Sequence, residues 1–258
     1  MSKQNDRPVL ETRRCAFFFD VDGTLAEIQP RPELVFIPPR SLAALEQLND
    51  QGVPVAVVSG RPISQLDALL SPLQLAAAGV HGAERRTAAG DLQQLVLDKE
   101  VLDAIQAELA QACAAHSGLS LENKGVAFAL HFRLAPELED TARALAEDFV
   151  SRYSEVLALQ PGKCVFELKP RGASKGEVIR TFMQEPPFAG RVPVFIGDDL
   201  TDEAGFEVVN ELGGITIKVG SGATQAKQRL DSVEAVAAWL EEVRSTLPAS
   251  QVNPTQQD

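Results

Sequence analysis

Cysteine and histidine are scarce in this sequence, and long hydrophobic runs are absent. The 258 residues include three cysteines and three histidines. Cys15, Cys113 and Cys164 form no CxxC or paired framework, so we expect free thiols in a reducing cytoplasm and no Cys/His metal site. No apolar stretch approaches the ~18 residues of a membrane helix, and Met1–Pro8 lacks the apolar core of a signal peptide. The sequence therefore predicts a cytoplasmic protein without a membrane partner.

Positive charge is also in short supply. The chain has 24 Lys and Arg residues against 36 Asp and Glu residues, a formal net charge of −12. Nucleic acids and anionic membranes bind basic surfaces, so we expect neither as a partner. With 45% hydrophobic residues the composition is that of an ordinary globular protein, and we expect a monomer.

Three short apolar segments each end abruptly in polar residues. They are Cys15–Phe19 before Asp20, Val53–Val58 before Ser59, and Val192–Ile196 before Gly197 and Asp198. A continuous apolar run is typical of a parallel strand buried on both faces, and ligands of open parallel sheets bind at the carboxyl ends of the strands. The sequence thus predicts an α/β fold with a Rossmann-like parallel sheet, in which Asp20, Ser59 and Asp198 share one crevice.

The middle of the chain has a different pattern, a helix followed by a hairpin, twice. Helix 101–113 precedes strands 119–122 and 126–133, and helix 136–153 precedes strands 156–160 and 164–169, which turn at Pro161 and Gly162. This pattern predicts an inserted α+β domain over residues 87–169. We assign 1–86 and 170–258 to the core, with crossings at Gly79–Gly90 and Pro170–Gly172 and a polar tail from about residue 248.

Polar residues mark the ends of the core helices. Ser174 begins a capping-box pattern, and Thr201 is expected to cap the helix that follows it. Gly52 is expected to end the helix over Ser41–Leu48, and Ser232–Val243 forms a last amphipathic helix.

The segment Asp20-Val-Asp22-Gly-Thr24 directly follows the first strand. A carboxylate there can attack phosphorus, and a second carboxylate two residues later can protonate the leaving oxygen and then deprotonate water. Gly23 lets the chain turn so that backbone N–H groups face phosphate oxygens. The alternative interpretation is a simple Asp/Gly turn.

Four carboxylates crowd into residues 198–203, where like charges favour a bound divalent cation. We predict Mg²⁺, with Asp20 and Asp198 as direct ligands beside the Asp22 carbonyl, and with Asp199 and Asp202 acting through water. The alternative, that Thr201-Asp-Glu only begins a helix, leaves Asp198 and Asp199 unexplained.

Two further segments offer groups to an anion. Lys175 lies in the first turn of a predicted helix, where a cation is unfavourable unless an anion is near. Ser59 supplies a hydroxyl, and Gly60 and Arg61 open a helix with free N–H groups.

In this order the segments around Asp20, Ser59, Lys175 and Asp198 resemble the four motifs of the haloacid dehalogenase superfamily, whose members use an aspartate nucleophile. The insert falls where that superfamily places a substrate-selecting cap. The sequences Ser59-Gly-Arg-Pro62, Val80-His-Gly-Ala-Glu84 and Gly197-Asp-Asp-Leu-Thr-Asp-Glu203 are similar to those of trehalose-6-phosphate phosphatases, over roughly residues 13–243. The resemblance implies that Glu122, Lys124, Arg133 and Glu167 of the cap bind the disaccharide, whereas His131 is expected to be structural.

The resemblance therefore implies a Mg²⁺-dependent phosphatase that converts trehalose 6-phosphate to trehalose and phosphate through an aspartyl-phosphate. Two alternatives remain open. One is a phosphatase for another sugar phosphate, such as sucrose phosphate or mannosyl-glycerate phosphate. The other is a regulatory domain that binds a sugar phosphate without hydrolysing it, against which the complete set of reactive residues argues.

Overall fold

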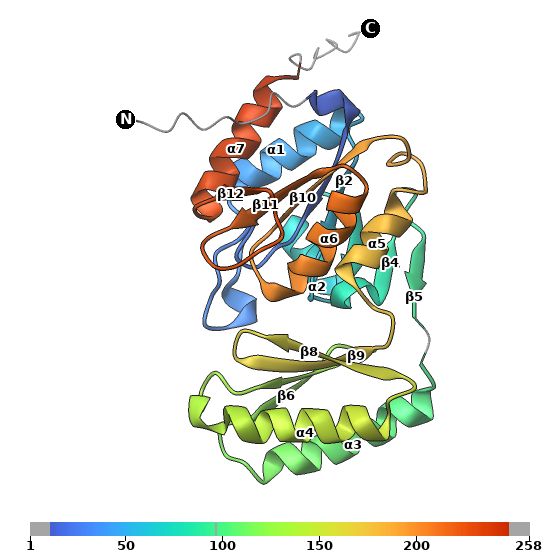
Figure 1. The fold of residues 1–258 in the computed structure, drawn as a ribbon, viewed down its shortest axis with the longest axis vertical. Helices are drawn as coiled ribbons and strands as arrows, with labels where there is room; N and C mark the ends of the chain where they lie inside the picture. Colours follow the sequence, from blue (N-terminus) through green and yellow to red (C-terminus); the bar gives the residue numbers. More distant parts are fainter. Residues whose placement is uncertain (1–10, 96, 248–258) are drawn as a thin grey trace, which may run out of the picture.

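The computed structural model describes residues 11–95 and 97–247, which form a larger and a smaller lobe (Figure 1). The larger lobe is built on an eight-stranded sheet in the order β12-β11-β10-β1-β2-β3-β4-β5. Six of its strands pair in parallel: β1 (Cys15–Phe19), β2 (Val55–Val58), β3 (Ala76–Gly79), β10 (Val192–Gly197), β11 (Ile215–Val219) and β12 (Gln228–Leu230). Two short strands, β4 (Glu84–Arg86) and β5 (Leu92–Gln94), extend one edge by antiparallel pairing. The predicted parallel core is confirmed.

Strand β1 is apolar throughout because helices cover both faces of this sheet. Phe17 and Phe19 pack on the face covered by α1 (Pro39–Asp50), α2 (Ile63–Leu70) and α7 (Val233–Ser245). Phe18 packs on the opposite face, against α5 (Lys175–Phe182) and α6 (Glu203–Glu211). Successive side chains of a strand point to opposite faces, so a strand between two helical layers needs no polar residue until it ends.

The smaller lobe has a four-stranded antiparallel sheet in the order β6-β7-β9-β8. Its elements are α3 (Lys99–Ala114), β6 (Ser120–Asn123), β7 (Phe128–His131), α4 (Glu139–Arg152), β8 (Leu157–Gly162) and β9 (Val165–Pro170). Phe166 and Leu168 pack against the two helices. Glu167 and Lys169, which alternate with them, point to the other face, and that face lies toward the larger lobe (Figure 1).

Two boundaries differ from the prediction. The chain leaves the larger sheet only after β5, so the predicted division at residues 86 and 87, and the crossing at Gly79–Gly90, lie too early. The second hairpin turns at residues 163–164, because Pro161 and Gly162 belong to β8. Strand β8 lies at the sheet edge, where the missing N–H of a proline costs no ladder hydrogen bond.

The prediction that Thr201 caps a helix is wrong. Asp199 caps a short 3₁₀ helix, η5 (Leu200–Asp202), and Asp202 bonds back to the Asp199 N–H in a reciprocal capping box. Ser174 does cap α5, where its hydroxyl accepts the Gly176 N–H at 3.2 Å. The other 3₁₀ helices are η1 (Thr12–Arg14), η2 (Pro32–Leu34), η3 (Val80–Gly82) and η4 (Pro136–Leu138).

Within residues 11–95 and 97–247 no helix is both long enough and apolar enough to cross a membrane. The predicted polar features of Met1–Pro8 and of the tail from residue 248 lie outside the described residues.

Gly176 provides a test of the packing between α5 and α6. A Cβ at this position would lie 2.3 Å from the Ala204 carbonyl oxygen, which is backbone and cannot rotate away. Gly→Ala in an open helix position raises stability by about 1 kcal/mol. Here we expect Gly176→Ala to lower the free energy of unfolding by about 1–3 kcal/mol, as in other overpacked sites.

Urea denaturation followed by circular dichroism measures this change. Glu46→Ala, on the exposed face of α1, is the control and should stay within about 0.5 kcal/mol of the unchanged protein. An unfolding free energy that rises in Gly176→Ala would contradict the close contact.

Candidate active site

A cavity of about 840 Å³ lies between the two lobes. Its volume is within the range of roughly 300–1,000 Å³ that is typical of small-molecule sites. The larger lobe contributes Asp20, Asp22, Ser59, Gly60, Arg61, Lys175, Asp198 and Asp199 to its lining, and the smaller lobe contributes Glu122, Lys124, Arg133 and Glu167. The ends of β1, β2 and β10 therefore meet at one cavity.

Lys175 joins two buried carboxylates at the floor of the cavity. Its Nζ donates to Asp20 Oδ1 at 2.9 Å and to Asp202 Oδ1 at 2.6 Å. Burial raises the pKa of Asp20 well above its usual range, and the charges of Asp202, Asp198 and Asp22 add to this effect, which Lys175 opposes. Burial opposes the charge of Lys175 too, but its two carboxylate partners outweigh burial and raise its pKa. Lys175 is thus held as a cation.

Asp198 lies beside Lys175 and its two carboxylate partners, and one of its own carboxylate oxygens is unpaired. Its Oδ1 is buried and has no hydrogen-bond partner among the described residues. Single oxygens of Asp20, Asp198 and Asp202 lie within 4.8 Å of one another. Burial, followed by the charge of Asp202, raises the pKa of Asp198 to about 7. An unpaired buried oxygen among three carboxylates fits a hard divalent cation, which prefers oxygen ligands.

Gly23 makes the approach of Asp198 possible. A Cβ at residue 23 would lie 2.1 Å from Asp198 Oδ2, and the residue has a φ of +85°. Both features require glycine, because an L side chain would be strained and would clash with the carboxylate. The turn after Asp20 is therefore shaped around Asp198.

The remaining carboxylates of residues 198–203 have structural partners. Asp202 Oδ2 accepts the N–H groups of Asp198 and Asp199, each at 2.9 Å. Asp199 Oδ1 accepts the Leu200 N–H at 2.7 Å, and Glu203 Oε2 accepts the Gln225 N–H at 2.8 Å. The alternative interpretation of this segment as a helix start thus holds for part of it, and Asp198 is the carboxylate that it leaves unexplained.

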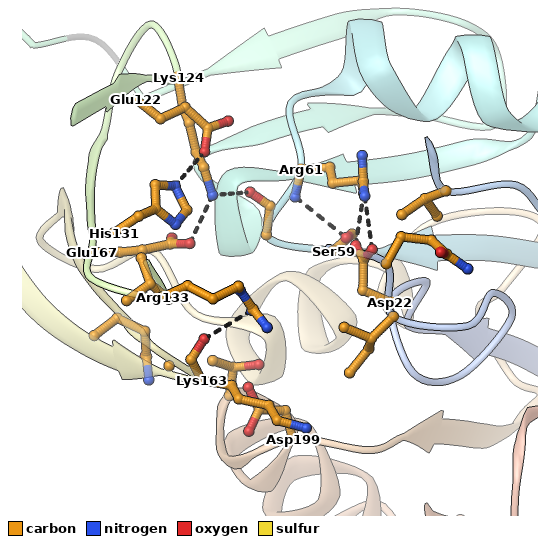
Figure 2. A pocket seen from close by; sticks show the side chains of 18 of the residues that line it. Asp22, Ser59, Arg61, Glu122, Lys124, His131, Arg133, Lys163, Glu167 and Asp199 are labelled. Carbon is orange, nitrogen blue, oxygen red and sulfur yellow. Dashed lines mark hydrogen bonds and ion pairs between the residues drawn. The ribbon is translucent and has the colours of Figure 1, made fainter. Parts of the chain in front are cut away.

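Arg61 faces Asp22 with two donors (Figure 2). Its Nε donates to Asp22 Oδ2 at 2.6 Å and its Nη2 to Oδ1 at 2.7 Å. Ser59 Oγ accepts the Arg61 N–H at 3.3 Å and is buried at the end of β2. This fork fixes the position of the Asp22 carboxylate at the edge of the cavity.

Three of the predicted site residues do not line the cavity, namely Gly23, Thr24 and Asp202. Thr24 is completely buried, and its Oγ1 has no partner among the residues described. Thr24 is therefore not placed to contact a ligand in this structure.

Two of the predicted ligand residues of the smaller lobe, Glu122 and Glu167, lie on the sheet face opposite the helices, whereas Lys124 follows β6 and Arg133 lies beyond the end of β7. Glu122, Ala129, Glu167 and Gln160 form one row across β6, β7, β9 and β8. The methyl group of Ala129 leaves space between the longer side chains. Lys124 Nζ donates to Glu167 Oε1 at 2.7 Å (Figure 2). The wall opposite Lys175 is therefore rich in charged groups that can bond hydroxyls.

Two more contacts define this wall. His131 Nε2 lies 2.8 Å from Glu122 Oε2, and this hydrogen bond lowers the pKa of Glu122. Arg133 is exposed, and its Nη2 donates to the Lys163 carbonyl, another residue of the cavity lining, at 3.2 Å (Figure 2).

Several polar residues at the site were not expected from the sequence. Gln160 lines the cavity, and its amide oxygen accepts a hydrogen bond from buried Lys169 at 3.0 Å. Burial lowers the pKa of Lys169 to about 8. Lys218 is also buried and donates to the Asp198 carbonyl. Cross-strand register could have indicated Gln160, but only with the hairpin turn placed at residues 163–164.

Comparison with known proteins gives a consistent result. The sequence pattern of the trehalose-phosphatase family matches residues 18–235. The trehalose-6-phosphate phosphatase of Escherichia coli (strain K12) is 47% identical over 256 residues, which cover 97% of this chain and 96% of that protein.

Two solved structures share the fold. The C-terminal domain of C. albicans trehalose-6-phosphate phosphatase matches with a TM-score of 0.81 at 22% identity, over 91% of this chain and 93% of that one. A haloacid dehalogenase-like hydrolase from Bacteroides thetaiotaomicron matches with a TM-score of 0.65 at 14% identity, over 88% and 98%. These structures confirm the expected fold, and the chain belongs to the trehalose-phosphatase family.

Proposed function

We propose that this protein hydrolyses trehalose 6-phosphate to trehalose and phosphate with the help of Mg²⁺. The observation that carries the proposal is the cluster of buried Asp20, buried Lys175 and half-buried Asp198 at the floor of a cavity whose opposite wall is lined by the charged side chains of the smaller lobe. The name of the E. coli relative supports the choice of substrate.

Asp20 is the nucleophile. One of its carboxylate oxygens attacks phosphorus, the bond between phosphorus and the sugar oxygen breaks, and an aspartyl-phosphate forms. Lys175 holds Asp20 in place through its 2.9 Å hydrogen bond and offers positive charge to the phosphoryl oxygens. Its raised pKa favours the charged form that this role requires.

Asp22 acts as the acid and then as the base. It gives a proton to the departing sugar oxygen, and it later takes a proton from the water that hydrolyses the aspartyl-phosphate. Arg61 holds the Asp22 carboxylate at the cavity edge by bonds to both of its oxygens, and one of these bonds must open before Asp22 can carry the proton that it gives. Ser59 Oγ and the backbone N–H of Gly60 would bond phosphoryl oxygens, whereas the Arg61 N–H already donates to Ser59 Oγ.

Asp20, Asp198 and the Asp22 carbonyl would bind Mg²⁺ directly, and Asp199 and Asp202 would act through water. The unpaired Asp198 Oδ1 supports this arrangement. Bound Mg²⁺ supplies positive charge to the phosphoryl oxygens. Lys218, which donates to the Asp198 carbonyl, holds the Asp198 backbone in position.

The smaller lobe serves as the substrate-selecting cap. Glu122, Lys124, Arg133 and Glu167 present carboxylates and cationic groups that bond sugar hydroxyls in several directions. The smaller lobe lies over the larger lobe (Figure 1), where it would limit the access of bulk water to the reacting phosphorus.

Replacement of the nucleophile is the first test. Asp20→Asn keeps the size of the side chain but removes its nucleophilic charge, so we expect the rate of phosphate release from trehalose 6-phosphate to fall at least ~10³-fold. A colorimetric phosphate assay with Mg²⁺ measures it. Asp50→Asn, at the exposed end of α1, should retain full activity. Turnover like that of the unchanged protein would exclude Asp20 as the nucleophile.

Metal binding can be tested without turnover. A cation that binds only the folded state stabilises it by about 2.7 kcal/mol at 100 times its Kd, which raises the melting temperature of a chain of this size by roughly 5–10 °C. We expect Mg²⁺ to produce such a rise, EDTA to reverse it, and Asp198→Asn to abolish it. An equal rise in Asp198→Asn would show that the cation binds elsewhere.

Arg133 tests the role of the cap in substrate selection. Loss of a hydrogen bond to a charged group costs roughly 1.5–3 kcal/mol, so Arg133→Ala should raise KM for trehalose 6-phosphate about tenfold or more. Hydrolysis of p-nitrophenyl phosphate, which is too small to reach the cap, should change by less than about twofold.

Steady-state kinetics on a panel that includes sucrose phosphate measures both effects, and Lys99→Ala on the exposed start of α3 is the control. Unchanged selectivity for trehalose 6-phosphate in Arg133→Ala would contradict the assignment of the cap residues.

A further inference from the structure

One carboxylate, that of Glu167, joins the two lobes above the cavity floor. Its Oε2 lies 2.6 Å from Nε2 of His81, which belongs to the larger lobe. Its Oε1 accepts from Lys124 Nζ at 2.7 Å, and the same ammonium donates to the Gly60 carbonyl of the larger lobe at 3.1 Å. The side chains of His81, Glu167 and Lys124 are all at least nine-tenths buried. Glu167 therefore makes one of these contacts between the lobes and bonds the ammonium that makes the other.

His81 reaches Glu167 from an unusual turn. Val80, His81 and Gly82 have φ values of 48°, 56° and 101°, three successive residues in the left-handed region. A positive φ is especially unfavourable for a β-branched residue such as Val80, and such strain persists only where the surrounding structure enforces it. Strained turns of this kind cluster at functional sites, so this one calls for a functional explanation.

The surroundings of the turn do enforce it. Val80 is completely buried in an apolar cluster that contains residues of both lobes: Val80, Ala83, Val126, Ala127 and Ala173. A Cβ at Gly82 would lie 2.9 Å from the Ser174 carbonyl oxygen, so the turn also abuts the start of α5, the helix that carries Lys175. The turn is thus wedged between the phosphoryl-binding floor and the smaller lobe.

The imidazole ring of His81 is held by packing and by Glu167. A Cβ at Gly60 would lie 2.8 Å from His81 Cε1, which shows that the ring rests on the Gly60 backbone. His81 Nδ1 is buried and has no partner among the described residues. Burial lowers the pKa of His81 more than Glu167 raises it, which favours the neutral ring, and Nε2–H of that ring can donate to the carboxylate.

We propose that the turn Val80–Gly82 is a latch between the lobes, in which His81 is a positioning residue that holds Glu167 and so sets the smaller lobe over the phosphoryl site. The inference rests on the proposed function for its kinetic consequence only. A sugar phosphate that bonds Glu167 and Lys124 needs these groups at a fixed height above Asp20. A small phosphate ester that binds only the floor does not need them.

His81→Asn tests the latch. Asparagine tolerates a positive φ better than most residues, so the turn can form, but its amide is too short to replace Nε2. Without substrate or Mg²⁺, we expect faster hydrogen exchange in peptides that cover the crossing at residues 171–173, and a larger radius of gyration in X-ray scattering. Glu167→Gln removes the same contact from the other lobe with an isosteric side chain, and it should change both measurements in the same direction.

His131→Asn is the matched control for these two measurements. It breaks a His–Glu hydrogen bond of 2.8 Å whose partners, His131 and Glu122, both belong to the smaller lobe. Exchange at residues 171–173 and the radius of gyration should therefore stay as in the unchanged protein. An equal increase in His131→Asn would mean that any loosening of the smaller sheet has this effect, and the latch would be rejected.

Steady-state kinetics on two substrates distinguishes a positioning role of His81 from a merely structural one. We expect His81→Asn to lower kcat/KM for trehalose 6-phosphate about tenfold or more, and to change hydrolysis of p-nitrophenyl phosphate by less than about twofold. Equal losses on both substrates, or no change in exchange and scattering, would overturn the proposal. If the unchanged protein failed to hydrolyse trehalose 6-phosphate, the proposed function would fail, while the exchange and scattering results would still decide whether the latch exists.

Discussion

The buried ammonium of Lys175 is the contact on which the cavity floor depends. It bonds Asp20, which follows the first strand, and Asp202, which follows the tenth, so a single cation ties together two strand ends and the start of α5. Removal of one partner from a buried ion pair typically costs about 3–5 kcal/mol, because the other charge is left without compensation. In the proposed function the same group offers positive charge to the phosphoryl oxygens. The fold and the proposed reaction therefore both require a positive charge at this position.

The hydrogen bonds around Lys175 also explain why one oxygen of Asp198 is left unpaired. One oxygen of Asp202 accepts from Lys175 and the other from two backbone N–H groups, whereas one buried oxygen of Asp198 has no partner within residues 11–95 and 97–247. Asp198 is held close to the turn at Gly23, where no side chain fits. The protein thus gathers more negative charge than its own side chains balance, at the point where a divalent cation and a phosphoryl group would complete the arrangement.

The two faces of the sheet in the smaller lobe have different roles. Phe166 and Leu168 pack under the helices, while Glu167 between them faces the larger lobe. Alternation along β9 therefore builds a core and a binding wall from neighbouring residues. Because both oxygens of Glu167 accept bonds from within the chain, the wall and the contact between the lobes cannot be altered independently.

Sequence alone determined the parallel core and the residues at its strand ends. Continuous apolar runs such as Cys15–Phe19 are local signals, and the rule that ligands bind at the carboxyl ends of parallel strands brings Asp20, Ser59 and Asp198 together without any knowledge of contacts. The helix–hairpin pattern of the insert was equally local. Its hairpin turn was misplaced because Pro161 and Gly162 usually mark turns, but an edge strand accepts them.

Only the tertiary structure decided which charged groups pair. The sequence could not show that Asp202 bonds Lys175, that Asp199 rather than Thr201 caps η5, or that His81 bonds Glu167 across 86 residues. Strand formation follows from a pattern within a few residues, whereas the partner of a charged side chain depends on which elements the whole fold brings within about 3 Å.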